Sequence, residues 1–272
     1  MSSVYDGIIR ILTKIDTTGV KTGVADIKKE VSAIGAVAGG IGKAMLALKA
    51  ASVLVDFGKQ AVSLASDLQE VQNVVDTAFG DMAYKCEEFA SIAIEQFGMS
   101  ELAAKQASST YMAMAKSMGI AAESASDMAI EIAKLTGDVA SFYNITQDEA
   151  STKLKSIFTG ETETLKDLGV VMTQANLKVY ALSIGITKDI SAMTQAELVS
   201  LRYKYVMQQL SMAQGDFAKT SGSWANQTRV LSERWKEFLS IIGEGLITVL
   251  LPVVKFLNTV LSVLIKIAEA IG

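Results

Sequence analysis

The stretch DFGKQAVSLASDLQEVQNVVDTAFGDMAYKCEEFASIAIEQFG, residues 56–98, decides the fold class. Its apolar side chains recur every three or four residues, as at Val62, Ala65 and Leu68. This spacing places them on one face of an α-helix and indicates that the helix is buried along that face. The dipeptide Gly80-Asp81 predicts a bend inside the stretch. We therefore expect helical segments, joined at this bend, that pack against neighbouring helices.

The rest of the chain also has the composition of a helical protein. One proline occurs among 272 residues, half of which are hydrophobic, so little in the chain would interrupt a helix. We expect an all-α fold: an elongated multi-helix assembly with a helical core region and apolar helical segments near both ends. The exception is residues 4–23, where isoleucines alternate with charged residues before a Thr-Thr-Gly turn, and this pattern allows a short β element.

Composition divides the chain into five expected segments. They are an N-terminal segment (1–23), a small-residue-rich apolar helix (24–58), a helical core (59–214), a linker (215–229), and an amphipathic helix that leads into an apolar segment (230–272). The linker is predicted from the Gly, Ser, Thr and Asn residues in GDFAKTSGSWANQTR. No repeat of fixed period precedes it, so neither a solenoid nor a long coiled coil is indicated there.

Two helix starts are marked inside the core. Ser100 is expected to cap a helix that begins at Glu101, because Gly98 ends the helix before it. Thr146 stands three residues before Glu149, which is the spacing of a capping box.

Residues suited to catalysis or metal binding are scarce. The chain has no histidine, which removes the commonest general base and metal ligand. Its single cysteine, Cys86, can form no internal disulfide and has no second thiol for a metal site. Carboxylate pairs such as Glu87-Glu88 have no partner that would make them an acid and a base. We expect no catalytic residue, no cofactor-binding residue and no metal ligand, and therefore no enzyme.

The glycine-rich stretch GAVAGGIGKA, residues 35–44, does not form a phosphate-binding loop. That motif needs a glycine where Val37 stands and a serine or threonine where Ala44 stands. Its small residues instead favour the close approach of another helix.

The charge pattern gives little support for nucleic-acid binding or export. The net charge is -4 and the basic residues are scattered, so no basic patch predicts sequence-specific binding to nucleic acid. The N-terminus carries Asp6, Arg10 and Lys14 inside what would be the apolar region of a signal peptide. We expect synthesis in a reducing cytoplasm.

The most apolar part of the chain is GEGLITVLLPVVKFLNTVLSVLI, residues 243–265. Its twenty central residues hold fourteen apolar side chains and one charge, Lys255, and are about long enough to cross a bilayer. A lysine at mid-bilayer costs about 3 kcal/mol, however, so we expect helix packing inside an assembly as the resting state and membrane entry as a second state. Just before this stretch, the helical period places Leu231, Trp235 and Leu239 on one side and Glu233 on the other.

Residues 35–55 and 241–267 are expected to carry the contacts with partners or with a membrane. The side chains singled out, together with those of the preceding amphipathic helix, are Leu46, Leu48, Val53, Leu54, Trp235, Leu239, Ile242, Leu246, Leu250, Val253, Phe256, Leu257, Leu261 and Leu264.

The order of three segments resembles one protein family. LTGDVASFYN (135–144), FTGETETLKDLGVVMTQANL (158–177) and SGSWANQTRVLSERW (221–235), the last running into an apolar helix, look like the core region of phage tail tape measure proteins and the segment that follows it. The resemblance covers roughly residues 60–260. Each segment alone is a weak signal, but their order is not easily produced by chance.

The resemblance implies a structural role. Members of the family are rod-like, mostly helical proteins that are packed in the tail tube, set tail length during assembly and leave the tube before the DNA. The implied partners are copies of the chain itself, tail tube and distal tail proteins, tail assembly chaperones and, on ejection, the host membrane. The implied locations are the lumen of the virion tail, the host cytoplasm during assembly and the host cell membrane during infection.

Chain length differs from the family, whose members are generally much longer. A fully helical chain of this length would reach roughly 400 Å. We therefore expect a shortened form, the N-terminal portion of a longer product, or a homologue that serves a short tail.

Two other classes of function stay open. A membrane-active protein, pore-forming or holin-like, would use the same apolar tail, because a helix with flanking lysines can lie in a membrane interface. An enzyme such as a wall hydrolase is the third class, because such domains are sometimes fused to tape measure proteins, and the lack of histidine speaks against it.

Overall fold

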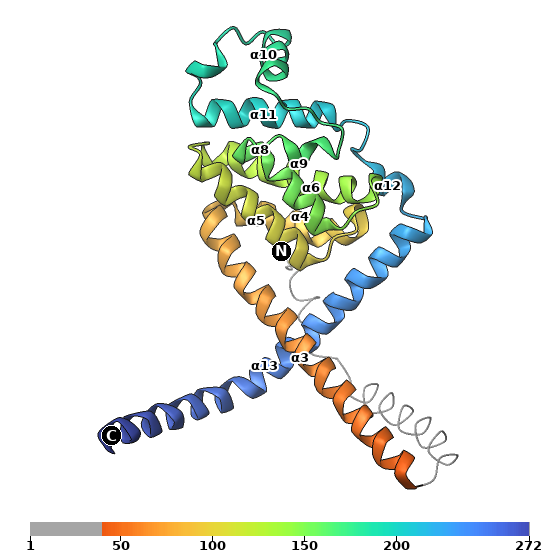
Figure 1. Ribbon diagram of the computed structural model, residues 1–272, viewed down its shortest axis with the longest axis vertical. Coiled ribbons are helices and arrows are strands. Elements are labelled where there is room, and N and C mark those ends of the chain that lie inside the picture. The colour runs from red at the N-terminus through yellow and green to blue at the C-terminus, as the bar shows by residue number, and fades with distance from the viewer. Residues whose placement is uncertain (1–39, 272) are drawn as a thin grey trace, which may run out of the picture. The chain divides into compact units, whose positions relative to one another are not determined.

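The computed structural model describes residues 40–271, which form helices and no strand, so the prediction of a mostly helical protein is confirmed. The β element expected at residues 4–23 lies outside the described residues. In chain order the elements are α3 (Gly40–Phe79), η1 (Gly80–Met82), α4 (Ala83–Phe97), α5 (Glu101–Ser117), α6 (Ala122–Phe142), α7 (Gln147–Leu154), α8 (Ser156–Thr159), α9 (Glu163–Lys166), α10 (Gln174–Ser183), η2 (Ile190–Ala192), α11 (Gln195–Gln209), α12 (Asp216–Thr220) and α13 (Trp224–Ile271) (Figure 1).

The chain divides into two units, and the boundary between them follows Phe57. Of the part before this boundary, the structure describes the backbone of α3 from Gly40, which is helical. Side-chain surroundings are described for residues 55–262 and for Ile265. The second unit, residues 58–272, holds the rest of α3 and all the helices that follow it.

The centre of the helical body is formed by α4, α5 and α6. Helices α5 and α6 pack on each other most extensively, and α4 packs against both. Alanines such as Ala129 and Ala133 on α6 are fully buried and allow the backbones to approach closely. Tyr111 of α5 is also fully buried and stacks on Phe158 of α8 with 6.0 Å between ring centroids. The core region expected from the sequence is thus built from long central helices with short ones packed on them.

The helix starts marked in the sequence are confirmed. Ser100 caps α5 by accepting a hydrogen bond from the Ala103 backbone amide, and Gly98 before it adopts a left-handed conformation with φ +63°. Thr146 caps α7 in the same way, accepting from the Glu149 amide at 3.1 Å, but the reciprocal bond of a capping box is not described at this pair. The bend expected at Gly80-Asp81 is the 3-10 turn η1. These local signals were readable because each depends on a few neighbouring residues.

The linker expected at residues 215–229 is not a linker. This stretch holds α12 and the first turns of α13, and it is tied to α6. The buried carboxylate of Asp138 accepts hydrogen bonds from the backbone amides of Gly215 (2.7 Å) and Phe217 (3.2 Å), and the Phe217 ring is buried beside Gly98. The glycine and polar residues in this stretch therefore cap and anchor a short helix.

Candidate functional site

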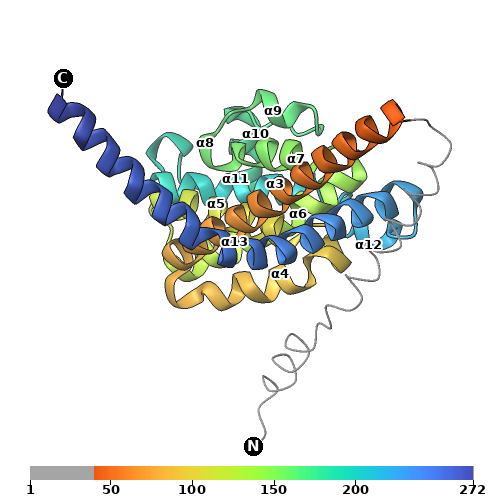
Figure 2. The ribbon, with the colours of Figure 1, turned by 90° about the horizontal axis from the view of Figure 1, so that it is seen from below.

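Helix α13 is the candidate functional element, because it carries the apolar residues singled out from the sequence. In both views it crosses α3, at the part of that helix that follows Phe57 (Figure 1, Figure 2). Its two faces differ in chemistry, and the face that packs on the helical body is largely polar.

Arg229 fixes the start of α13 to the end of α6. One guanidinium nitrogen, Nη2, donates to the carbonyl oxygens of Ala140 (3.0 Å) and Ile145 (3.1 Å). Carbonyl groups at the C-terminal end of a helix have no partner within the helix, and a cation satisfies them both by hydrogen bonding and by charge. The desolvation of Arg229 lowers its pKa from the ordinary value. The start of α13 is thus held by a polar contact of Arg229, whereas an amphipathic helix is ordinarily held by apolar contacts.

Asn226 joins α13 to two further helices. Its side-chain amide is buried and donates to Ser141 Oγ on α6 and to Thr220 Oγ1 on α12, both at 2.9 Å. The Ser141 hydroxyl in turn donates to a carboxylate oxygen of Asp216 at 2.6 Å. A closed set of polar contacts therefore holds the beginning of α13.

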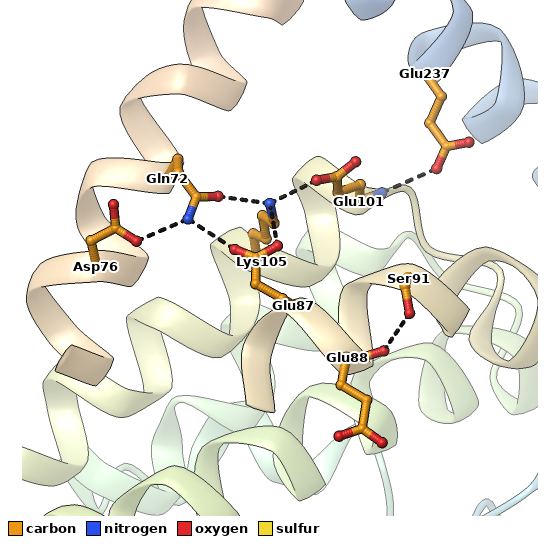
Figure 3. A network of polar contacts seen from close by, with 8 residues as sticks. All are labelled: Gln72, Asp76, Glu87, Glu88, Ser91, Glu101, Lys105 and Glu237. Atoms are coloured by element: carbon orange, nitrogen blue, oxygen red, sulfur yellow. Dashed lines mark hydrogen bonds and ion pairs between the residues drawn. The ribbon is translucent and has the colours of Figure 1, made fainter. Parts of the chain in front are cut away.

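Glu237 contacts the N-terminus of α5. Its carboxylate accepts a hydrogen bond from the Glu101 backbone amide at 3.2 Å, one of the amides that a helix start leaves free (Figure 3). Partial burial raises the pKa of Glu237, although the bond from Glu101 opposes this shift. The contact places α13 beside a second polar cluster on the body.

That cluster centres on Lys105, a buried lysine of α5. Its ammonium contacts carboxylate oxygens of Glu101 (2.7 Å) and Glu87 (2.8 Å) and donates to the Gln72 side-chain oxygen (2.7 Å), while the Gln72 amide donates to Asp76 and Glu87 (Figure 3). Desolvation lowers the pKa of Lys105, but its hydrogen bonds with Glu101 and Glu87 outweigh it and the pKa is raised. The ammonium therefore stays charged and joins α3, α4 and α5.

Glu233 corrects the predicted orientation of α13. The sequence pattern placed it on the solvent side, but it is only 6% exposed, whereas Leu231 is 70% exposed. One carboxylate oxygen of Glu233 contacts Lys236 at 2.7 Å, and the other, Oε2, has no hydrogen-bond partner among the described residues. The prediction was wrong for Glu233 and Leu231 because the first turns of α13 contact the polar ends of α5 and α6, whereas Leu239, from the predicted apolar side, is buried.

The crossing of α3 and α13 is a contact between small residues. A Cβ atom built on Gly243 would collide with the Ala61 carbonyl oxygen and would lie 2.8 Å from the Ala65 Cβ. Leu239, one turn earlier, is buried with 2% exposure, so it packs inside this chain and is not available as the partner contact that the sequence suggested. Ile242 and Leu246 are half-buried.

The remaining apolar side chains of α13 are mostly exposed: before the crossing they lie opposite the inward polar residues, and from Thr248 to Ser262 every described side chain is exposed. Trp235 is exposed, and its ring lies 5.4 Å from that of Phe238. The exposed large apolar residues of α13 are Trp224, Leu231, Trp235, Phe238, Ile241, Val249, Leu250, Leu251, Val253, Val254, Phe256, Leu257, Val260, Leu261 and Ile265. Of the contact residues singled out from the sequence, this set includes Trp235, Leu250, Val253, Phe256, Leu257 and Leu261. The side chains of Leu46, Leu48, Val53, Leu54 and Leu264 lie outside the described part.

Helix α13 also meets the requirements of length and composition for a membrane span. Among the described residues, 224–262 form the one helix that does so, and 17% of its most apolar window is buried. Helices of soluble proteins can meet the same requirements, so the finding concerns length and hydropathy only.

Among the described residues, no site suited to catalysis or metal binding lies beside the exposed apolar side chains of α13. In residues 40–271, as far as they are described, no group of three or more His, Cys, Asp or Glu side chains could hold a metal ion. A cavity of about 780 Å³ lies between α5, α7 and α13, but two of the charged groups that line it are already bound: Arg229 to backbone carbonyls and Lys236 to Glu233. The burial of Cys86 raises its pKa to about 12, which makes its thiol a poor nucleophile.

Sequence reasoning missed the inward polar residues Asn226, Arg229 and Glu237. Their helical spacing was available as a signal, but polar residues at such positions ordinarily face water.

Comparison with known proteins identifies no family: no protein-family model matches the chain, and no curated protein or solved structure is significantly similar to it.

Proposed function

We propose that this chain is a structural protein of a phage tail or prophage-derived tail, comparable to the core region of tape measure proteins. It would be packed in the tail tube, take part in tail assembly and length determination, and accompany genome delivery through the host envelope. The observation that carries the proposal is the exposed apolar face of α13, on a helix whose inward face is polar. Such a helix needs a partner that the residues described by the structure do not supply.

The extent of this face supports the proposal. Fifteen large apolar side chains of α13 are at least 38% exposed, whereas soluble monomers rarely expose contiguous apolar patches larger than about 300–600 Å². A surface of this size stays in solution only when it is covered. In the proposed role it is covered by copies of the chain, tube and distal tail proteins, or assembly chaperones, and the host membrane is the partner after ejection.

The segments that carry the family resemblance have defined roles in the fold of this chain. In LTGDVASFYN, Thr136 lies 3.0 Å from the buried Tyr111 hydroxyl, and Asp138 caps α12. In FTGETETLKDLGVVMTQANL, the carbonyl oxygen of Val171 accepts a hydrogen bond from Tyr205 at 2.9 Å. In SGSWANQTRVLSERW, Arg229 anchors α13. Each segment thus contributes a hydrogen-bonded contact within the helical body.

Electron microscopy of particles tests the proposal. We expect that deletion of residues 60–230 from the encoding phage or prophage yields particles without tails or with tails of abnormal length. Particles carrying Ser262→Ala, a small change on a polar position of α13, serve as the control and should have ordinary tails. The chain should also co-purify with isolated tail tubes. Tails of normal form and length in the deletion would overturn the proposal.

A membrane-active protein, pore-forming or holin-like, is the second candidate. The observation that favours it is the length and hydropathy of α13. Purified chain would then release a dye from liposomes, and a lysine substituted at an exposed apolar position such as Leu257 would abolish the release. Co-purification with tail tubes and no dye release favours the first function instead.

A further inference from the structure

The cavity between α5, α7 and α13 has no part in the proposed structural role. It measures about 780 Å³, within the range of about 300–1,000 Å³ that is usual for sites that bind small molecules. Helix α13 lines it with Ser232 and Glu233, the start of α7 lines it with Asp148, and Leu64 and Leu102 contribute from α3 and α5. All these residues belong to the second unit of the chain.

Glu233 indicates which kind of ligand the cavity suits. The residue is 6% exposed, and its Oε2 atom is buried without a hydrogen-bond partner among the described residues, whereas Oε1 contacts the Lys236 ammonium at 2.7 Å. A carboxylate removed from water is costly unless its oxygens are paired, so Oε2 calls for a donor or a cation. The Lys236 side chain is half-exposed and has several rotatable bonds, so it can move aside and admit a ligand to Oε2.

The charges around the cavity favour a cation over an anion. Three carboxylates line it, those of Asp148, Glu149 and Glu233, against two cations, Arg229 and Lys236. Both cations are already bound, Arg229 to backbone carbonyls and Lys236 to Glu233. Asp148 is exposed and forms no ion pair within the described part of the chain. An anion would be repelled by these carboxylates, whereas a cation would neutralise them.

The neutral polar groups on the walls offer acceptors as well. The Thr228 hydroxyl donates to the Ala225 carbonyl oxygen at 2.9 Å, so its own oxygen is left as an acceptor. The Gln147 amide group donates to the Gly98 carbonyl oxygen, and the Gln147 side-chain oxygen accepts no bond from the described residues. The described lining contains no aromatic ring, which a quaternary ammonium would need. A cation that carries N–H donors therefore matches the walls.

The carboxylates of this cavity do not form a metal site, because no group of three or more acidic side chains among the described residues could hold a metal ion. Separate positive charges joined by an apolar chain fit better, since Leu64, Leu102 and Ile145 line the same space and can contact methylene groups. We infer that the cavity binds an alkyl polyamine, with one ammonium group on Glu233 of α13 and another on Asp148 of α7. Lysine side chains of another protein present the same chemistry.

A bound polyamine would bridge two helices. Because Glu233 and Asp148 lie on α13 and α7, the ligand should hold the start of α13 more firmly on the helical body. Amide hydrogen exchange in the first turns of α13 should then slow when spermidine is added. This effect does not depend on the structural role proposed for the chain.

Isothermal titration calorimetry of the full-length chain with spermidine tests the inference. Excess magnesium chloride is present throughout, because it screens unspecific attraction to a chain of net charge -4. We expect one spermidine to bind per chain. A trilysine peptide, titrated in the same buffer, distinguishes a free polyamine from the lysine side chains of a protein.

Three variants locate the site. Glu233→Gln should weaken binding by at least about tenfold, because a charged hydrogen-bond acceptor is lost. Ser232→Trp keeps every charge but fills space on the α13 wall, so it should also prevent binding, and it decides the question if Glu233→Gln does not fold. Glu163→Gln removes an exposed carboxylate of α9 outside the cavity and should leave binding unchanged. Circular dichroism and the protection of the buried Cys86 thiol from alkylation check the helical body.

Several results would overturn the inference. One is the failure of both spermidine and trilysine to bind, and another is binding that magnesium abolishes. Equal losses in Glu233→Gln and Glu163→Gln would show unspecific attraction, and unchanged binding in Glu233→Gln and Ser232→Trp would place the ligand elsewhere. Tighter binding of trilysine than of spermidine, lost in the same two variants, would support the site and assign it to lysine side chains.

Discussion

Gly243 of α13 lies directly against the backbone of Ala61 of α3, so closely that any Cβ at position 243 would overlap the Ala61 carbonyl oxygen. Two glycines stand near this crossing, and only one of them is in contact, since a Cβ on Gly245 would meet nothing within 4 Å. The pair allows steric contact to be separated from helix propensity.

We expect Gly243→Ala to destabilise the protein and Gly245→Ala to stabilise it slightly. Alanine in a helix gains about 0.5–1 kcal/mol over glycine, which is the expected effect at position 245. At position 243 the clash with the α3 backbone should outweigh that gain by about 1–3 kcal/mol. Urea unfolding followed by circular dichroism measures both changes. Equal stabilisation by the two substitutions would show that α3 and α13 do not pack at this crossing.

Local features of the fold were predictable, whereas the orientation of α13 was not. The caps at Ser100 and Thr146 were read from a few neighbouring residues, because a cap depends only on its own turn. The wrong orientation arose because the residues that determine it, Glu237 and Arg229, bind backbone groups of helices far away in sequence. Such partners leave no periodic signal in the chain.

The linker prediction failed for the same reason. Gly215 and the serines after it have the composition of a flexible joint, but Asp138, which caps this turn, lies 77 positions earlier. The apolar residues from Leu250 to Leu261, which hydropathy alone marks, are exposed in the structure, and their contact with something outside the chain stays a prediction. What covers them stays a proposal.

Asp138→Asn should lower stability by about 1–3 kcal/mol. Both carboxylate oxygens accept backbone amides, from Gly215 and Phe217, and an asparagine can offer an oxygen to only one of them. The other amide would be left buried without an acceptor. Urea unfolding gives the change, and Asp167→Asn, on an exposed carboxylate paired with Lys153, is the control that should have little effect. A matching loss in both variants would contradict the capping role.

Cys86 should resist alkylation in the folded protein. Its burial, with a smaller contribution from Glu87, raises the thiol pKa from 9.0 to about 12. At pH 8.5 the thiolate fraction is then roughly a thousandfold lower than in the unfolded chain. Iodoacetamide labelling with and without urea, quantified by mass spectrometry, measures the difference. Rapid labelling of the native chain would show that the thiol is accessible.

The same shift predicts how stability depends on pH. Between about pH 9 and pH 12 the unfolded chain has lost the Cys86 proton and the folded chain has kept it. The folded state therefore binds more protons in this window, and stability falls as pH rises through it. Cys86→Ala should reduce this fall. The unfolding free energies of the unmodified protein and of Cys86→Ala are each measured at pH 8 and pH 10. The fall between the two pH values should be smaller in the variant.

Arg229→Lys should weaken the attachment of α13 although the charge is kept. The guanidinium binds the carbonyl oxygens of Ala140 and Ile145 through Nη2 and the Asn226 side-chain oxygen through Nη1, and a lysine ammonium, with a single nitrogen, cannot reproduce this fork. We expect a loss of about 1.5–3 kcal/mol in unfolding free energy, the range for hydrogen bonds that involve a charged group. The matched control is Arg234→Lys, since Arg234 forms an exposed ion pair with Glu95 and should contribute little.

Amide hydrogen exchange in α13 provides a second test of Arg229→Lys. If Arg229 is the anchor, amide hydrogen exchange in the first turns of α13 should become faster in this variant, while exchange in α5 and α6 stays slow. Unchanged exchange in α13, together with lost stability, would show that Arg229 supports the end of α6 alone. The attachment of α13 to the helical body would then depend on Asn226 and Glu237. The double variant Asn226→Ala with Glu237→Gln would be the one to release the helix.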